Sequence, residues 1–140
     1  MNDDETEFLN VDLELRADFL PELVYERMKN HVFDMYFGES TRGEYLFSCE
    51  IEDFTIRDAD LIINEFCDLV DQFSINERAE WDRCTSRVFD LGYRSRSSEN
   101  KIHTTRIRRE TLSRINAVGA EIVISVYPIE VPVVAVPESE

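Results

Sequence analysis

Basic side chains are scarce in this sequence, and that scarcity argues against several classes of partner. The 140 residues include 15 Lys and Arg against 30 Asp and Glu, which gives a formal net charge of −15. Each phosphate of a nucleic acid or of an anionic membrane surface would approach against this negative field. We therefore expect neither nucleic acid nor membrane as a partner, and the charge favours attraction to a basic protein.

Three residue types that build chemical sites are also few. Four glycines provide no glycine-rich loop for phosphate. The only histidines, His31 and His103, form no credible ligand pair, so we expect no metal and no cofactor. Cys49, Cys67 and Cys84 are odd in number and lack C-x-x-C spacing, which predicts buried free thiols in a reducing cytoplasm. A pairing of Cys84 with His103 as a nucleophile stays open as an alternative.

Long apolar runs are absent as well. No run approaches the length of a transmembrane helix, and the acidic start Met-Asn-Asp-Asp-Glu-Thr-Glu is opposite in charge to a signal peptide. The length and a hydrophobic content of 43% fit one domain that buries a core without disulfides. We predict a disordered acidic leader at 1–7, a single α+β domain at 8–128 and an extended Pro/Val tail at 129–140, in a cytoplasmic protein.

Apolar residues recur at two different spacings along the chain. Apolar residues at every second position predict strands, and apolar residues three and four positions apart predict helices. Their order, βαββααβ followed by (β)αβ, predicts an α+β fold: a mostly antiparallel or mixed sheet of five to six strands, with helices packed on one face. Strands are predicted at 9–16, 31–37, 45–51, 87–93, 102–107 and 122–126, and helices at 18–30, at 58–73, from 74 onward and through 112–118.

Local signals predict where three of the helices begin or end. Asp18 is expected to cap the first helix, with Pro21 in its first turn. Ser74 and Glu77 form a capping box at the start of the third. Gly119 is expected to end the last helix in a left-handed conformation.

The polar sides of the strands together predict an acidic face that binds a partner. Phe33, Met35 and Phe37 are expected to point at the core, which places Asp34 on the bare side. Asp is disfavoured inside strands, so Asp34 and Asp90 suggest a functional role. The candidate partner-binding residues are Asp12, Glu14, Asp34, Tyr36, Ser48, Glu50, Asp90 and Glu121. Ser125 and Tyr127 are expected on the same face.

Two other interpretations of this face stay open. One is the ordinary solvated side of an antiparallel sheet, where polar residues alternate with buried ones. The other is a catalytic carboxylate pair, which needs two carboxyl groups in different environments. Nothing in the sequence shows a pocket that would create that difference, so we expect no catalytic residues and no enzyme.

The charge is unevenly distributed. Residues 1–80 hold 22 acidic and 6 basic side chains, net −16, whereas 81–140 hold 8 acidic and 9 basic, net +1. The basic segment 83–114 either neutralises the acidic half inside the fold or forms a second binding surface. Within it, 94–101 is rich in Ser and Arg and predicts an exposed, mobile loop.

Two stretches resemble a known group of proteins. They are Trp81-Asp82-Arg83-Cys84-Thr85-Ser86-Arg87-Val88-Phe89-Asp90-Leu91-Gly92-Tyr93, and Ile107-Arg108-Arg109-Glu110-Thr111-Leu112 with Gly119-Ala120 and Ser125-Val126-Tyr127-Pro128. The chain is similar there to a family of small uncharacterised bacterial single-domain proteins that are immunity-protein-like. The similarity spans residues 9–128. It implies a bacterial cytoplasmic protein and offers no catalytic residues.

The charge and the lack of catalytic patterns predict a non-enzymatic protein-binding module of immunity or inhibitor type. Such a module neutralises a basic protein, for example a toxin, by covering it with the acidic sheet face. The alternative is a structural or assembly module whose tail, 129–140, adds to a neighbour's sheet edge. That arrangement would give a homo-oligomer such as a homodimer.

Overall fold

A computed structural model describes residues 6–95 and 102–128 of the chain. These residues form five strands and four helices. In chain order they are β1 (Glu7–Ala17), α1 (Glu22–Met28), β2 (Val32–Glu39), β3 (Tyr45–Ile51), α2 (Ala59–Asp71), α3 (Ile75–Arg83), β4 (Ser86–Ser95), α4 (Arg109–Ala117) and β5 (Glu121–Pro128). Among the described helices, none has both the length and the apolar character that crossing a membrane requires.

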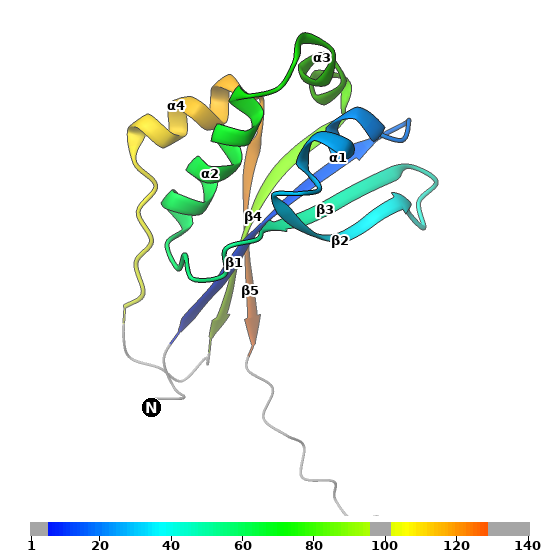
Figure 1. Cartoon of the computed structure of the whole chain (residues 1–140). Helices are drawn as coiled ribbons and strands as arrows, with labels where there is room; N and C mark the ends of the chain where they lie inside the picture. The colour runs from blue at the N-terminus through cyan, green and yellow to red at the C-terminus, as the bar shows by residue number, and fades with distance from the viewer. Residues whose placement is uncertain (1–5, 96–101, 129–140) are drawn as a thin grey trace, which may run out of the picture.

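The strands form one sheet in the order β2-β3-β1-β4-β5 (Figure 1). Neighbouring strands run antiparallel except β4 and β5, which are parallel. A parallel pair needs a crossover connection, and here that connection contains α4. The predicted α+β fold, with a mixed sheet and helices on one face, is confirmed.

All four helices pack on the same side of the sheet, which we call the helix side (Figure 1). Helix α2 lies on β1 and β3, while α1 contacts α3 and α4 contacts α2. The apolar residues of the strands meet them there: the ring of Phe89 lies 5.6 Å from that of Phe66, and Tyr25 stacks on Phe37 at 3.9 Å between ring centroids. The opposite side of the sheet is the open face.

Two of the predicted helix signals are confirmed. The hydroxyl of Ser74 accepts from the N–H of Glu77 at 3.1 Å, and the Glu77 carboxylate accepts from the N–H of Ser74 at 2.9 Å. Gly119 follows α4 with φ of +70°, a conformation that costs a glycine little.

Two other helices receive carboxylates from distant elements at their first turns. Within the described residues α1 has no side-chain cap, so the cap predicted at Asp18 is wrong. The buried carboxylate of Glu80, in α3, instead accepts from the N–H of Val24 at 2.7 Å. At α4, the buried carboxylate of Asp60 accepts from the N–H of Arg108 at 2.8 Å. These long-range partners satisfy the N–H groups that a helix start leaves unpaired.

Strand β2 contains a bulge that reverses the predicted sides of its first half. The register shifts between Asp34 and Tyr36, which leaves Met35 as an extra residue. Asp34 lies opposite the buried Cys49, and therefore on the helix side, not on the open face. Phe33 was predicted in the core and is instead 55% exposed on the open face.

Some predicted segments differ from the structure or lie outside it. Residues 102–107 do not form a strand, and Ile102 is exposed. Arg94 and Ser95 belong to β4, so only 96–101 of the predicted loop falls outside the described residues. Glu7, predicted to end the leader, begins β1. Thr6 is described just ahead of β1, whereas residues 1–5 of the leader and the tail at 129–140 lie outside the described residues.

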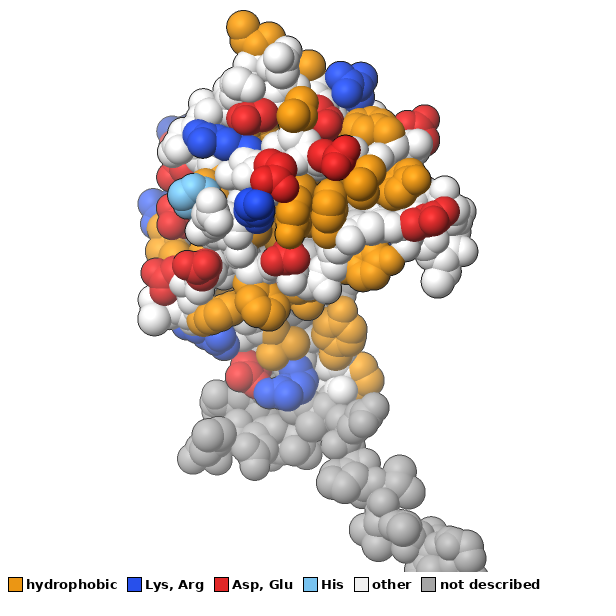
Figure 2. All heavy atoms as spheres, turned by 45° about the vertical axis from the view of Figure 1, so that its right-hand side comes forward, with side chains coloured by type: hydrophobic (Ala, Val, Ile, Leu, Met, Phe, Trp, Pro, Cys, Tyr) orange, Lys and Arg blue, Asp and Glu red, His pale blue; other side chains and the backbone are white. Residues whose placement is uncertain are grey.

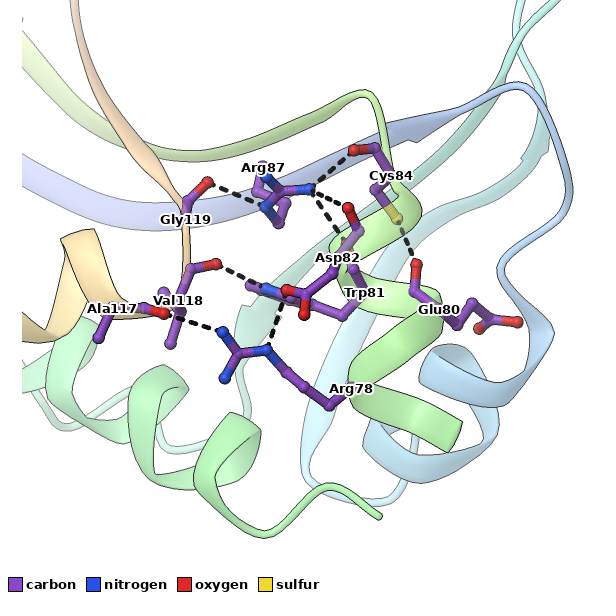
Figure 3. A network of polar contacts seen from close by, with 9 residues as sticks. All are labelled: Arg78, Glu80, Trp81, Asp82, Cys84, Arg87, Ala117, Val118 and Gly119. Atoms are coloured by element: carbon purple, nitrogen blue, oxygen red, sulfur yellow. Dashed lines mark hydrogen bonds and ion pairs between the residues drawn. The ribbon is translucent and has the colours of Figure 1, made fainter. Parts of the chain in front are cut away.

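One guanidinium joins the end of α3 to the turn before β5. Arg87 lies near the start of β4 on the helix side, opposite the buried Leu15. Its Nε donates to the carbonyl oxygen of Gly119 at 2.9 Å (Figure 3). Its Nη1 donates to the carbonyl oxygens of Trp81 at 3.1 Å and Cys84 at 2.7 Å. These bonds satisfy carbonyls that the end of a helix leaves without intrahelical partners.

Two side chains of α3 hold the same turn. The buried indole N–H of Trp81 donates to the carbonyl oxygen of Val118 at 2.8 Å, and Nη2 of Arg78 donates to that of Ala117 at 2.8 Å (Figure 3). With the Arg87 bond to Gly119, three consecutive carbonyls are held by side chains. The network therefore fixes the point from which β5 enters the sheet.

Replacing Arg87 with Met should destabilise the fold by about 2–4 kcal/mol, because several carbonyl oxygens lose a charged donor at once. Urea unfolding followed by circular dichroism measures the loss. The matched change is Arg83→Met, whose guanidinium is exposed and lies 5.2 Å from the ring centroid of Phe19. That control should cost less than about 1 kcal/mol, and an equal loss in both variants would contradict the role given to Arg87.

Candidate protein-binding face

The open face is built from the side chains that alternate with the buried ones on all five strands. The four described helices lie on the other side of the sheet (Figure 1). The strand register places on this face Phe33 and Tyr36 of β2, Leu46, Ser48 and Glu50 of β3, Asn10, Asp12, Glu14 and Arg16 of β1, Val88, Asp90 and Arg94 of β4, and Glu121, Val123, Ser125 and Tyr127 of β5.

Three carboxylates lie side by side across the middle of the open face. Asp12 on β1 lies directly opposite Glu50 on β3 and directly opposite Asp90 on β4. Residues that face each other in this way have Cβ atoms about 4.5–5.5 Å apart. Like charges at this spacing repel, and protonation or a nearby cation relieves the repulsion. We call Glu50, Asp12 and Asp90 the carboxylate row.

Asp12 lies at the centre of the row and has an unsatisfied oxygen. Its Oδ1 is buried and has no hydrogen-bond partner among the described residues. Burial raises the pKa of Asp12 from 3.8 to about 7, helped by the hydrogen bond and charge of Glu50 and by the charges of Asp90 and Glu14. Near neutral pH the Asp12 carboxyl is therefore partly protonated, and an approaching cation would favour loss of that proton.

Neutral side chains orient the two outer members of the row. The Asn10 amide donates from Nδ2 to Oε2 of Glu50. The Ser125 hydroxyl donates to Oδ1 of Asp90 at 2.8 Å. These donors hold the carboxylates in place without cancelling their charge.

The arginines of this face lie towards the ends of the strands and have acidic partners of their own. Arg16 pairs with Glu44 at 2.8 Å, and Arg94 pairs with Glu7 at 2.6 Å. Both pairs are partly exposed, so each is expected to contribute little to stability. Because these cations are paired with Glu44 and Glu7, they are not positioned to neutralise the carboxylate row.

Exposed aromatic rings border the row on the β2 side. Phe33 lies opposite Glu50, and its ring meets that of Phe54 edge-on at 6.2 Å between centroids. Tyr36, further along β2, is also exposed. Figure 2, which is turned so that the right-hand side of Figure 1 comes forward, shows hydrophobic side chains lying among acidic ones. The periodicity of the sequence does not place Phe33 and Phe54 here, because neither a bulge nor a ring contact from a loop leaves a periodic signal.

The hollow beside the row is small. The hollow that Asn10, Glu50 and Phe54 help to line has a volume of about 70 Å³. Pockets that bind small molecules measure about 300–1,000 Å³. At this point the face therefore suits the surface of a macromolecule better than a small ligand.

The structure brings most of the predicted residues together and moves one away. Asp34 is exposed, but it lies on the helix side because of the bulge in β2. Val32, which precedes the bulge and pairs with Ile51, is buried on the helix side. The predicted residues that do lie on the open face are Asp12, Glu14, Tyr36, Ser48, Glu50, Asp90 and Glu121, with Ser125 and Tyr127. Their contact with a partner stays a prediction.

The three cysteines are free and buried, as predicted. Burial raises the pKa of Cys67 and of Cys84 to about 11, and that of Cys49 well above its usual value. A thiol that stays protonated at neutral pH is a poor nucleophile, which argues against the pairing of Cys84 with His103. In the described part of the chain, no group of three or more His, Cys, Asp and Glu residues could hold a metal ion.

Part of the basic segment 83–114 neutralises the acidic half within the fold. Arg114 on α4 reaches two carboxylates of α2, Asp68 and Asp71, each at 2.7 Å. Its second nitrogen donates to the side-chain oxygen of Asn64 at 2.8 Å. These contacts join α4 to α2 on the helix side, away from the carboxylate row.

Comparison with known proteins adds no relative: no protein-family model, no curated protein and no solved structure matches the chain. The resemblance to small bacterial immunity-like proteins therefore stays a prediction. The geometry of the open face is the basis for inferring a function.

Replacing Asp12 with Asn should stabilise the protein at pH 8 but not at pH 4. The raised pKa means that the folded state holds the proton more tightly than the unfolded chain does. Stability linked to Asp12 is therefore complete below about pH 4 and is lost as the pH rises through about 7. We expect a gain of about 1 kcal/mol at pH 8, after allowing for solvent screening of a half-buried group.

Thermal unfolding at the two pH values measures this difference. Glu65→Gln, on the exposed side of α2, removes one negative charge outside the carboxylate row and serves as the control. If Asp12→Asn stabilises the protein equally at pH 4 and pH 8, the folded state does not hold the Asp12 proton more tightly than the unfolded chain does.

Proposed function

We propose that this protein is a non-enzymatic protein-binding module of the immunity or inhibitor type, which neutralises a basic partner protein through its open face. The partner would present Lys or Arg side chains to the carboxylate row and cover the neighbouring aromatic rings. A basic toxin has the chemistry that this surface would recognise. The three buried free thiols are consistent with action in a reducing cytoplasm.

The carboxylate row, with Asp12 at its centre, is the observation that carries this proposal. A guanidinium or ammonium group placed above the row would pair with Glu50 and Asp90 and lie close to the Asp12 carboxyl between them. Its charge would lower the pKa of Asp12, so binding would remove the repulsion that the free protein tolerates. The electrostatic energy of the carboxylate row is therefore higher in the free protein than in the complex.

The exposed rings supply the apolar contact that charge alone does not. Phe33, Tyr36 and Phe54 are each about half exposed at the border of the row. Aromatic anchors beside complementary charges are common where protein interfaces are strongest, and cations also stack favourably on aromatic faces. A sheet surface holds these groups in a fixed arrangement, which limits the entropy lost on binding.

The charge of the whole chain would assist the encounter. A net charge of −15 attracts a basic partner over a distance and raises the association rate at low salt. An inhibitor that must reach its target before damage occurs benefits from that rate. The same negative field repels nucleic acids, so these anionic polymers would not compete with the basic partner for the open face.

The double substitution Glu50→Lys with Asp90→Lys should weaken binding by about a hundredfold or more, because like charges then face the partner's basic side chains. Isothermal titration calorimetry at two salt concentrations measures affinity and its salt dependence. Basic proteins encoded beside this gene are the specific candidates, and a synthetic arginine-rich peptide is the general probe.

The matched control is Asp34→Lys with Glu65→Lys, which changes the net charge equally but alters exposed residues outside the open face. It should leave the affinity for a specific partner within about threefold. Equal losses in both double variants would mean that net charge alone determines binding, and the proposed role of the open face would fail. Circular dichroism verifies that each variant is folded.

A further inference from the structure

The outer edge of β5 is long, regular and apolar. Strand β5 lies at one end of the sheet, so among the described strands only β4 pairs with it. Its eight residues follow β4 in unbroken register, and 122–127 contain no charged side chain. Ile124 is 64% exposed and Val126 is 59% exposed. Such an edge presents a row of backbone N–H and C=O groups that can pair with another strand.

The opposite edge of the sheet is protected in a way that β5 is not. Strand β2 is interrupted by the bulge at Met35 and carries Asp34 in its middle. Bulges and charged residues on edge strands oppose the addition of a further strand. Of the two edges of this sheet, only the β5 edge therefore has the regular backbone and uncharged side chains that strand addition requires.

We propose that a second copy of this chain occupies the β5 edge, with the two β5 strands antiparallel about a two-fold axis at Ile124. The two sheets would then form one continuous sheet. A two-fold axis perpendicular to the sheet keeps both open faces on the same side, and both sets of helices on the other. The dimer therefore leaves each carboxylate row accessible, and the inference does not depend on the function proposed above.

The sequence of β5 is complementary to itself in this arrangement. Residues that face each other across an antiparallel pair share a side of the sheet, so each must meet a residue of the same orientation. With the axis at Ile124, Ile122 meets Val126 of the second copy and Ile124 meets its own copy, all on the helix side. On the open face, Val123 meets Ser125 and Glu121 meets Tyr127. Like charges do not meet in any of these pairs.

The distribution of charge favours a second copy at this edge over other occupants. Two molecules of charge −15 repel each other, but that charge resides in residues 1–80, net −16, whereas 81–140 carry net +1. Strands β4 and β5 and helix α4 all belong to the nearly neutral part, so this edge brings two copies together where repulsion is smallest. A basic partner would find no opposite charge between Ile122 and Tyr127.

The first test is the mass of the chain in solution, measured by light scattering after size-exclusion chromatography. We expect the wild type to have twice the mass of the 16.4 kDa chain. Ile124→Lys, which places two ammonium groups opposite each other on the axis, should be monomeric. Met35→Lys, an equally drastic change at an exposed position on β2, should stay dimeric. Circular dichroism verifies that both variants are folded.

The second test locates the axis by cross-linking. Ile124→Cys should form an intermolecular disulfide on mild oxidation, because the two copies of residue 124 face each other. Val123→Cys should not, because residue 123 faces residue 125 and its two copies lie more than about 7 Å apart. The native cysteines are buried and are expected to remain unreacted.

Three outcomes would overturn this inference. The first is a wild type that is monomeric at all concentrations. The second is a dimer that persists unchanged in Ile124→Lys. The third concerns residues 129–140, which follow β5 directly: a monomer that dimerises only when they are deleted would show that the chain's own tail occupies the edge. Retention of the dimer after that deletion supports pairing of β5 with β5.

Discussion

The hydrogen bonds of the Arg87 guanidinium are the constraint on which the arrangement of the last third of the chain depends. They hold the end of α3 against the turn between α4 and β5, together with the Trp81 and Arg78 bonds. Because that turn is fixed, β5 enters the sheet beside β4 and parallel to it. The open face and the β5 edge both follow from this placement: Ser125 reaches Asp90 on the open face, and the outer side of β5 becomes an edge.

The helix side of the sheet stabilises the fold, whereas the open face is the candidate for partner recognition. The helix side concentrates the large buried side chains, among them Trp81, Phe47 and Phe66, and it supplies most of the apolar burial. The open face contains a repulsive carboxylate row that lowers stability in the free protein. Natural proteins often carry such locally unfavourable groups where they bind, because the rest of the fold is stable enough to tolerate them. This division is what makes the open face the better candidate for partner contact.

Periodicity in the sequence was sufficient to predict the fold class and most of the open face. It was reliable wherever strands alternate without interruption, as from Asp12 to Glu14 and at Asp90. It failed at β2, because one extra residue at Met35 exchanges the two sides of the strand and sends Asp34 to the helix side. The local capping signal at Asp18 also failed, because an N–H in the first turn of α1 is satisfied by Glu80, a residue more than fifty positions away. Contacts of that kind have no local signature.

The burial of Cys49, Cys67 and Cys84 gives this fold three internal reporters of its own opening. They lie on β3, on α2 and directly after α3, and burial raises the pKa of each thiol. A thiol reagent can modify them only when the surrounding element separates from the core, so labelling rates would follow local and global opening separately. Cys84 belongs to the Arg87 network, while Cys49 is adjacent to Glu50 of the carboxylate row. Labelling at these two positions would therefore distinguish motion of the Arg87 network from motion of the open face.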